Sequence, residues 1–401
     1  MKNGNRWRRQ TLGWLLSSSL LLLSACAGFG GDNSSPRGAS FRYALVACSD
    51  FSGRNSVALI QLKPARTPRL WMDYLVDLGS DPSLDPIINI ADLTRARRAF
   101  VIERQYFSAT GLGSVATLDP QDRFQLATTY PVNDGVNPAN PQDILVLRDD
   151  KAYVTRYDPA YNDILIVNPD TGAAAGHVDF TGKGTNSDGV PRLFKMRYLQ
   201  GRVWVLMQNW TFNPIPPPVL EFGPGLIGVV DPETDSIEDI ITLETENPAD
   251  QGYDARQNRL YVASTGDWTD PSTSGIEAIN PKTRASTGVL ISGAAVGGFI
   301  THMVFKDAHT AYLAVTKSDF SGDKVVRVNP ADGVVGKTLY EYPGLWYVPD
   351  LALDNQHNLL IADNSSSRVV LLDPDTGLIL DSFDTLAPPV SLAIWEGEDK
   401  L

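Results

Sequence analysis

Polar residues recur at one position in the sequence, ten residues before the centre of a strand-like segment. Asp143, His302 and Asp350 stand there in three segments, and Asn89 stands near the same position in a fourth. Carboxylate and amide oxygens are the ligands that calcium and magnesium prefer, whereas imidazole suits zinc. If the segments converge, these residues predict a site for a divalent cation, calcium or magnesium, with His302 as a candidate catalytic base. The alternative is a ring of solvated polar side chains. Near the same position in the other segments stand Arg192, Gln251 and Ser391.

Patterns typical of other chemistries are missing from the sequence. It holds no HExxH pair, P-loop, GxSxG elbow, CxxCH haem motif or EF-hand loop. His309 and His357 fall in expected hairpins, where we expect exposure to solvent. The formal net charge is −13, and phosphate binding needs clustered Lys and Arg, so a nucleic-acid partner is excluded.

Aromatic residues recur in the expected loops and form a second group of candidates. The string Ser-Asp-Phe-Ser-Gly occurs at residues 49–53 and again at residues 318–322. Buried aromatic side chains dominate the energetics of many interfaces, so these loops could anchor a partner. The alternative is that these aromatic residues recur because they pack within the repeat. The candidate binding residues are Phe51, Phe107, Trp210, Trp268, Phe320, Trp346 and Tyr347.

An internal repeat must position these residues. Seven times a short apolar strand runs into a residue followed by proline, usually Asp or Asn, and the prolines lie 44 to 63 residues apart. In such a turn Asn or Asp accepts local backbone hydrogen bonds while proline presets the next φ angle. Another strand, rich in aromatic and β-branched residues, precedes each of the last six of these apolar strands. Each repeat therefore reads as a four-stranded antiparallel meander.

A single sheet of this kind has two apolar faces and cannot stand alone, whereas sheets packed radially cover one another. We therefore predict an all-β, seven-bladed β-propeller over residues 41–401. The first repeat begins at its second strand, residues 43–48, and residues 390–395 supply a spare first strand whose pairing would close the ring. Long insertions at 69–86, 127–141, 208–225 and 340–349 fall on one loop face, which we expect to bind a partner.

Two repeats resemble known propeller families. Residues 151–155 and 163–172 resemble the tyrosine-valine-threonine-asparagine (YVTN) repeat, with Arg156 in place of its asparagine, and residues 358–370 are similar to the NHL repeat. The resemblance extends over about residues 41–401. It implies a propeller, and such propellers serve as binding scaffolds, lyases, lactonases or surface-layer components.

The N-terminus has the pattern of an exported lipoprotein. Basic residues precede the apolar run 12–23, which is too short to span a bilayer, and residues 1–25 read as a signal peptide. Residues 23–26 resemble a lipobox, which predicts lipidation of Cys26 and a flexible tether over residues 26–40. Ala27 follows this cysteine, and the resemblance to Gram-negative lipoproteins then implies the outer membrane, on either its periplasmic or its surface side. Cys48 is then the remaining cysteine, and its alternating context predicts a buried strand thiol.

Two functions fit these observations. The first is a monomeric, lipid-anchored scaffold that binds an envelope protein or an extracellular ligand through its insertion-rich face and contacts the membrane through the lipid alone. The alternative, which the resemblance to propeller enzymes implies, is a divalent-metal-dependent lyase or lactonase with its site at the mouth of the central channel. A surface-layer or adhesion role is a third reading.

Overall fold

The computed structural model describes residues 40–50, 55–63, 68–75, 86–91, 98–104, 112–213, 219–344 and 348–398. The chain divides into two units, Met1–Arg37 and Gly38–Leu401, and every described residue belongs to the second. The predicted signal peptide and the tether as far as residue 39 lie outside the described residues. So do five of the candidate residues, namely Cys26, Phe51, Phe107, Trp346 and Tyr347.

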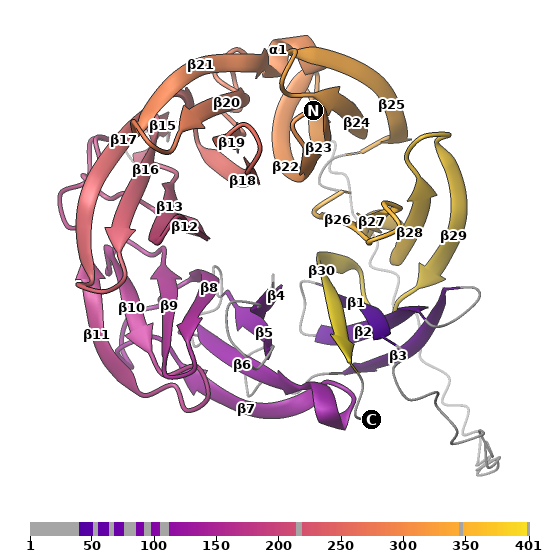
Figure 1. Ribbon diagram of the computed structural model, residues 1–401, viewed down its shortest axis with the longest axis horizontal. Helices are drawn as coiled ribbons and strands as arrows, with labels where there is room; N and C mark the ends of the chain where they lie inside the picture. Colours follow the sequence, from indigo (N-terminus) through magenta and orange to yellow (C-terminus); the bar gives the residue numbers. More distant parts are fainter. Residues whose placement is uncertain are drawn as a thin grey trace, which may run out of the picture. The chain divides into compact units, whose positions relative to one another are not determined.

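Seven four-stranded antiparallel sheets surround a common axis, which confirms the predicted propeller (Figure 1). From the axis outward, blade 1 contains β30 (Pro389–Glu398), β1 (Ser40–Ser49), β2 (Asn55–Lys63) and β3 (Arg69–Leu75). Blade 2 contains β4 (Ile87–Ala91), β5 (Arg98–Glu103), β6 (Ser114–Asp119) and β7 (Gln125–Pro131). Blade 3 contains β8 (Pro141–Arg148), β9 (Lys151–Arg156), β10 (Asp163–Val167) and β11 (Ala174–Asp179).

Blades 4 to 7 have the same strand order. Blade 4 contains β12 (Leu193–Leu199), β13 (Arg202–Met207), β16 (Pro224–Asp231) and β17 (Ser236–Glu246), and blade 5 contains β18 (Pro248–Asp254), β19 (Arg259–Ser264), β20 (Gly275–Asn280) and β21 (Ala285–Ser292). Blade 6 contains β22 (Gly298–Asp307), β23 (Thr310–Lys317), β24 (Asp323–Asn329) and β25 (Val334–Tyr342). Blade 7 contains β26 (Leu351–Leu353), β27 (Leu359–Asp363), β28 (Arg368–Asp373) and β29 (Leu378–Asp384).

Burial follows the position of a strand within its blade. In blade 5 the middle strands β19 and β20 are buried at nearly every residue, because neighbouring blades cover both of their faces. The outer strand β21 alternates between exposed and half-buried residues, as expected for a strand with one solvated face. The apolar runs recognised in the sequence are therefore the middle strands.

The turns between third and fourth strands use the predicted chemistry. Asn168 Oδ1 accepts hydrogen bonds from the N–H groups of Asp170 and Thr171, both at 3.0 Å. Asp373 Oδ1 accepts from Asp375 N at 2.9 Å in the matching turn of blade 7. In both of these turns the last residue is a glycine with positive φ, Gly172 in blade 3 and Gly377 in blade 7.

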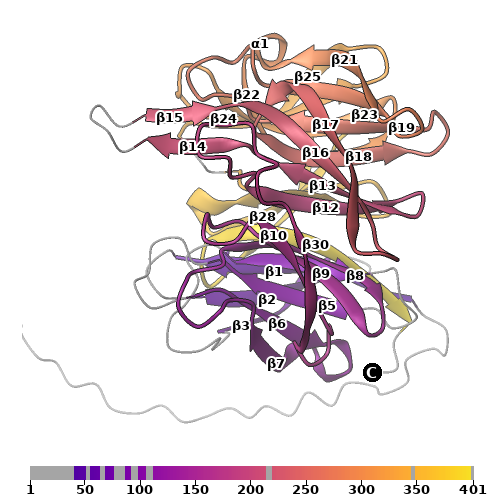
Figure 2. The ribbon, with the colours of Figure 1, turned by 90° about the vertical axis from the view of Figure 1, so that its left-hand side faces the viewer.

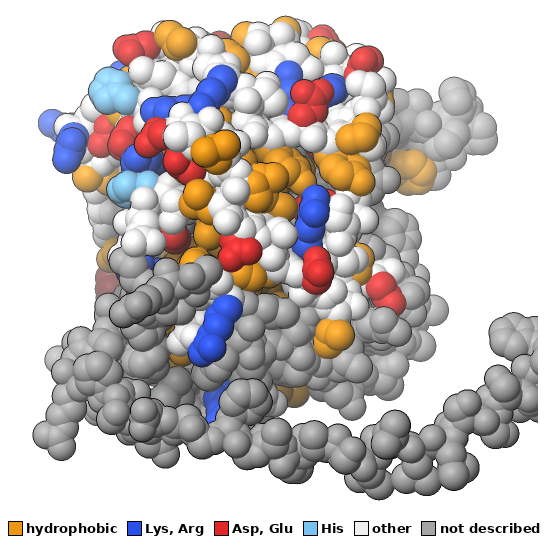
Figure 3. All heavy atoms as spheres, turned by 90° about the vertical axis from the view of Figure 1, so that its right-hand side faces the viewer, with side chains coloured by type: hydrophobic (Ala, Val, Ile, Leu, Met, Phe, Trp, Pro, Cys, Tyr) orange, Lys and Arg blue, Asp and Glu red, His pale blue; other side chains and the backbone are white. Residues whose placement is uncertain are grey.

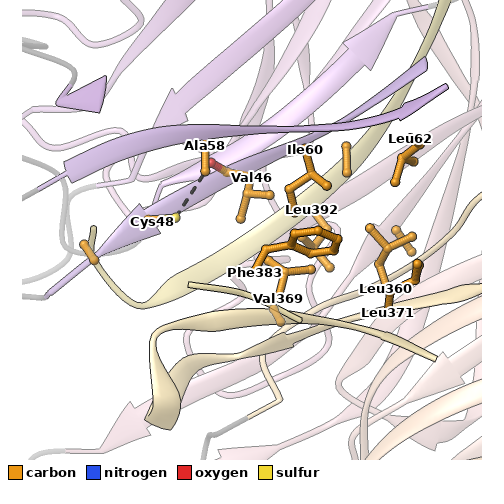
Figure 4. Close-up of a cluster of buried hydrophobic side chains, with 14 residues drawn as sticks. Val46, Cys48, Ala58, Ile60, Leu62, Leu360, Val369, Leu371, Phe383 and Leu392 are labelled. Carbon is orange, nitrogen blue, oxygen red and sulfur yellow. Dashed lines mark hydrogen bonds between the residues drawn. The ribbon is translucent and has the colours of Figure 1, made fainter. Parts of the chain in front are cut away.

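The last strand closes the ring by pairing with the segment that the sequence predicts. β30 pairs with β1 so that Leu392 lies opposite Val46 and Ile394 opposite Ala44. Figure 4 shows the apolar side chains of blade 1 packed against those of blade 7, with Leu392 among them. Cys48 is buried in this cluster, and its Sγ lies 3.9 Å from the carbonyl oxygen of Val46.

One element was not expected. Within the insertion 208–225 the strands β14 (Trp210–Asn213) and β15 (Val219–Phe222) form a two-stranded ribbon that projects from blade 4 (Figure 2). Aromatic and β-branched residues on both sides of the proline run favour extended strands, which explains the ribbon. The proline run itself, residues 214–218, lies outside the described residues. Among the residues that the structure describes, no helix has the length and apolar character needed to cross a membrane.

Candidate functional site

The inner strands enclose a cavity of about 480 Å³ to which all seven blades contribute. It lies near the N-terminal ends of the first strands, where the sequence places the polar ring. The connection that contains β14 and β15 emerges on the same side, because it joins the second and third strands of blade 4. The charged or titratable residues that line the cavity are Arg104, Asp143, Lys195, Arg197, Asp250, His302 and Asp350.

His302 lies between two carboxylates. Its Nδ1 is 2.6 Å from Asp250 Oδ2, and its Nε2 is 2.6 Å from Asp350 Oδ1. A neutral imidazole has one N–H donor, so two such contacts require the imidazolium form. Burial alone would lower the pKa of His302, but Asp250 and Asp350 outweigh it and raise the pKa to about 9.

Lys195 completes this group. Its Nζ lies 3.1 Å from Asp250 Oδ2 and 3.4 Å from His302 Nδ1. Burial would raise the pKa of both carboxyl groups, but the cation of His302, with Lys195, holds the pKa of Asp250 and Asp350 below its ordinary value. Two cations and two anions therefore form one neutral network at the wall of the cavity.

Asp143 behaves differently although its position in the blade is equivalent. Asn89 Nδ2 donates to its Oδ1 at 2.5 Å, and the N–H of Met196 donates to its Oδ2 at 2.7 Å. Burial dominates over these contacts and raises the pKa of Asp143 to about 6. Asp143 is therefore a carboxyl group that can gain or lose a proton near neutral pH.

The three aspartates also join neighbouring blades. Each accepts a hydrogen bond from a backbone N–H of the next first strand: Asp143 from Met196, Asp250 from Met303 at 3.2 Å, and Asp350 from Leu392 at 2.7 Å. This shared task explains why an acidic residue recurs at one position of the repeat. The cavity thus uses side chains that the fold already requires.

The predicted cation ligands Asn89, Asp143, His302 and Asp350 all line this cavity, but they form two separate contacting pairs. Asn89 contacts Asp143, whereas His302 contacts Asp350, and across the part of the chain that the structure describes no group of three or more His, Cys, Asp or Glu residues is arranged to hold a metal ion. Lys195 already places an ammonium group against Asp250 and His302. These residues, as they stand, do not fit a divalent cation.

The aromatic candidate Trp210 packs at the base of the projecting ribbon. Its ring centroid lies 6.2 Å from that of Tyr157, and the guanidinium of Arg192 stacks 4.8 Å from the ring. Arg192 Nε also donates to the carbonyl oxygen of Trp210 at 3.1 Å. Arg192 stands two residues before Phe194, and Phe194 lines the cavity. The contact of Arg192 with Trp210 therefore joins the ribbon to the rim of the cavity. Arg192 itself holds this ribbon and is absent from the lining.

Trp268 and Phe320 come together over a residue that the sequence analysis did not single out. Phe299, which is buried, lies 5.2 Å from the ring of Trp268 and 5.6 Å from that of Phe320. The three rings join blades 5 and 6, which agrees with a packing device of the repeat. Phe320 keeps 42% of its surface exposed.

Sequence reasoning missed Lys195, Arg197 and Asp250. In blade 5 Gly252 lies opposite Tyr261, nine residues later, whereas in blade 6 Val304 lies opposite Tyr312, eight residues later. The first hairpin of blade 5 is therefore one residue longer, so counting back ten residues from Tyr261 reaches Gln251 instead of Asp250. Lys195 and Arg197 alternate along β12 and therefore share a face.

No family model matches the chain, and no curated protein matches it. Solved structures do. The periplasmic gluconolactonase of Pseudomonas aeruginosa is 13% identical with a TM-score of 0.58, over 88% of this chain and 99% of that chain. A putative 6-phosphogluconolactonase from Bacteroides fragilis is 11% identical with a TM-score of 0.56, over 90% of this chain and 99% of that one.

A third similar structure is apo AztD from Citrobacter koseri, which is 12% identical with a TM-score of 0.53, over 90% of this chain and 100% of that chain. At such identities the likeness shows the fold alone. The chain is a seven-bladed propeller similar in fold to these proteins. The resemblance to YVTN and NHL repeats stays a prediction.

Proposed function

We propose that this protein is an exported propeller that binds a small anionic, hydroxylated ligand in its central cavity. The observation that carries the proposal is the charge of the lining. Four cationic side chains face three carboxyl groups, of which Asp143 takes up a proton near pH 6, in a chain of net charge −13. A positive cavity in an acidic protein favours an anion.

The size and the remaining lining narrow the ligand class. A volume of about 480 Å³ is in the range of small-molecule sites, roughly 300 to 1,000 Å³. Asn89, Gln251, Thr301 and Ser391 add amide and hydroxyl groups that can hydrogen-bond ligand hydroxyls. A small hydroxy acid uses both kinds of group, so this proposal refines the predicted binding scaffold to a small molecule at this site.

Calorimetric titration with D-gluconate, a hydroxylated carboxylate, tests this proposal. We expect binding to the wild type and a weakening of about 10²- to 10⁴-fold in the double variant Lys195→Met and Arg197→Met, since each of the two charged hydrogen bonds contributes about 1.5 to 3 kcal/mol. Lys183→Met is the matched control, because Lys183 is an exposed lysine outside the cavity lining. Equal affinity in the double variant and the control would contradict the proposal.

Lactone hydrolysis is a second candidate, and Asp143 favours it. As a carboxylate, Asp143 can accept a proton from water while the water oxygen attacks the lactone carbonyl and the ring C–O bond breaks, the ring oxygen then gaining a proton. Lys195 and Arg197 would stabilise the oxyanion. Two of the similar structures carry lactonase names, which supports testing this reaction.

The test is the rate of glucono-δ-lactone opening above its spontaneous rate, measured by pH-stat. We expect Asp143→Asn to lower an enzymatic rate by about 10²- to 10⁴-fold, the usual contribution of a general base. The predicted metal dependence has no fitting ligand set, so chelator should leave this rate unchanged. A wild-type rate equal to the spontaneous rate would leave binding as the function of the cavity.

We also propose that the chain is exported and tethered to the outer membrane through lipidated Cys26. The basic and apolar leader and the lipobox-like residues 23–26 support this proposal. Metabolic labelling with palmitate should mark the wild type and not Cys26→Ser, which should appear in the soluble fraction. Protease added to intact cells would distinguish the surface side from the periplasmic side and would also test the surface-layer reading.

Binding of an envelope protein at the insertion-rich face is a further part of the proposal. Phe212 and Leu220 face each other across the ribbon β14–β15, with 53% and 44% of their surface exposed. An exposed apolar pair on a projecting arm is typical of a docking site. Crosslinking through a photoreactive residue at position 212 in intact cells should capture one specific protein, and capture should fail in Leu220→Ser.

A further inference from the structure

A second cavity, of about 540 Å³, lies away from the channel site. The hairpins that join first and second strands in blades 5, 6 and 7 surround it. His302 and Asp307 both belong to β22, and five residues of strand span about 16 Å. The two cavities therefore lie toward opposite ends of the first strands.

Cationic and imidazole side chains gather around this second cavity. They are Arg256, Lys306, His309 and His357. Among the described residues neither Arg256 nor Lys306 takes part in an ion pair, whereas cations elsewhere, such as Arg98 and Arg284, do. Figure 3 shows histidine side chains near Lys, Arg, Asp and Glu side chains along one edge of the visible surface.

The two acidic residues of the lining are engaged by the backbone. Asp254 Oδ1 accepts a hydrogen bond from the N–H of Arg256 at 2.8 Å, and Asp307 Oδ1 accepts from the N–H of His309 at 2.9 Å. Each aspartate thereby fixes the hairpin that presents the following basic residue. The aspartates shape the hairpins, and the long side chains of Arg256 and Lys306 keep their donors for a ligand.

The lining also has a fixed aromatic part. Phe305 stacks on Tyr261 with ring centroids 5.0 Å apart, and it lies so close to Gly252 that a Cβ there would overlap it. Tyr253 is held by a hydrogen bond from its hydroxyl to Asn258 Oδ1 at 2.9 Å. Packing of this kind keeps the wall in place before any ligand binds.

We propose that this hairpin-face cavity binds a phosphate-bearing ligand. A guanidinium fork, an ammonium group and two imidazoles offer donors in several directions, which suits a tetrahedral group with three terminal oxygens better than a planar carboxylate. Phe305 and Tyr253 provide apolar area for the part of the ligand next to the phosphate. The proposal stands on residues separate from the channel cavity and does not depend on its function.

Calorimetry with phenyl phosphate and with inorganic phosphate tests the site. We expect the wild type to bind phenyl phosphate more tightly than inorganic phosphate, and the double variant Arg256→Gln and Lys306→Gln to bind phenyl phosphate at least about tenfold more weakly. Lys183→Gln removes an exposed positive charge outside both cavities and should bind like the wild type. Unchanged binding in the double variant, or no binding by the wild type, would overturn the proposal.

Two further measurements test the role of the imidazoles and the source of the phosphate group. His309→Asn with His357→Asn should weaken phenyl phosphate by a smaller factor, and unchanged affinity would remove the imidazoles from the site. Vesicles of phosphatidylcholine with and without phosphatidic acid separate the sources of phosphate. Sedimentation with phosphatidic acid that the Arg256 and Lys306 variant abolishes assigns a lipid headgroup, whereas binding of phenyl phosphate without sedimentation assigns a free phosphorylated molecule.

Discussion

Asp143, Asp250 and Asp350 perform the same task between blades and yet hold their protons differently. The nearest cation decides the difference. His302 touches Asp250 and Asp350, and its charge holds the pKa of both below the ordinary value, whereas burial outweighs the neutral contacts of Asp143 and raises its pKa to about 6. One position of the repeat therefore supplies two fixed anions and one titratable group.

His302 should make the folding stability depend on alkaline pH. Its pKa is about 9 in the folded protein and about 6.5 in an unfolded chain, so its contribution is complete below pH 6.5 and is lost as pH rises through 9. We expect urea denaturation to show a loss of about 3 kcal/mol between pH 6.5 and pH 10. His309→Gln, at an exposed histidine, should keep this loss.

His302→Gln should be destabilised at pH 6.5 by about 3 to 5 kcal/mol, because it leaves two buried carboxylates without their cation. It should also lose less stability than the wild type on going to alkaline pH. Parallel pH profiles for His302→Gln and the wild type would show that the imidazolium is not what holds these carboxylates.

At the scale of elements, the turns between third and fourth strands also hold neighbouring blades together. Tyr130 of blade 2 donates from its hydroxyl to the carbonyl oxygen of Pro169 at 3.3 Å, so the turn of blade 3 rests on the outer strand of the blade before it. Gly172 ends that turn with φ +71°, and a Cβ there would overlap the ring of Tyr130. The glycine is required both for backbone conformation and for close approach.

A pair of glycine variants can separate these two requirements. Gly182 has φ +70°, and a Cβ added at this residue would have no neighbouring atom within 4 Å. Gly182→Ala should therefore cost about 1 to 2 kcal/mol of folding free energy, from the left-handed backbone alone. Gly172→Ala should cost about 1 to 3 kcal/mol more, the usual effect of overpacking, in urea denaturation. Equal losses would show that the turn can move away from Tyr130.

At the scale of the whole molecule, local signals in the sequence were sufficient for the fold. The residue before each proline, such as Asn168, and the apolar middle strands repeat in every blade, and their count and order predict seven blades and their closure. The site depends on finer features. The first hairpin of blade 5 is one residue longer than that of blade 6, which displaces Asp250 from the count, and Lys195 belongs to no repeated pattern. The second cavity arises where three hairpins meet, which no single repeat encodes.

Closure by the last strand should control folding of the entire ring. Deleting residues 389–401 removes β30, exposes the hydrogen-bonding edge of β1 and uncovers Val46 and Ala44, which are fully buried. We expect the shortened chain to lose the cooperative thermal transition and to aggregate. Deleting residues 399–401, which lie outside the described residues, is the matched control and should leave the transition unchanged.

A synthetic peptide of residues 389–398 should restore the transition when added to the shortened chain during refolding, since it supplies the missing first strand in trans. Restoration should also recover gluconate binding, because Ser391 and its neighbours line the central cavity. A shortened chain that keeps the wild-type transition without peptide would mean that the other six blades and the remaining three strands hold the ring together, so that β30 completes the cavity without securing the fold.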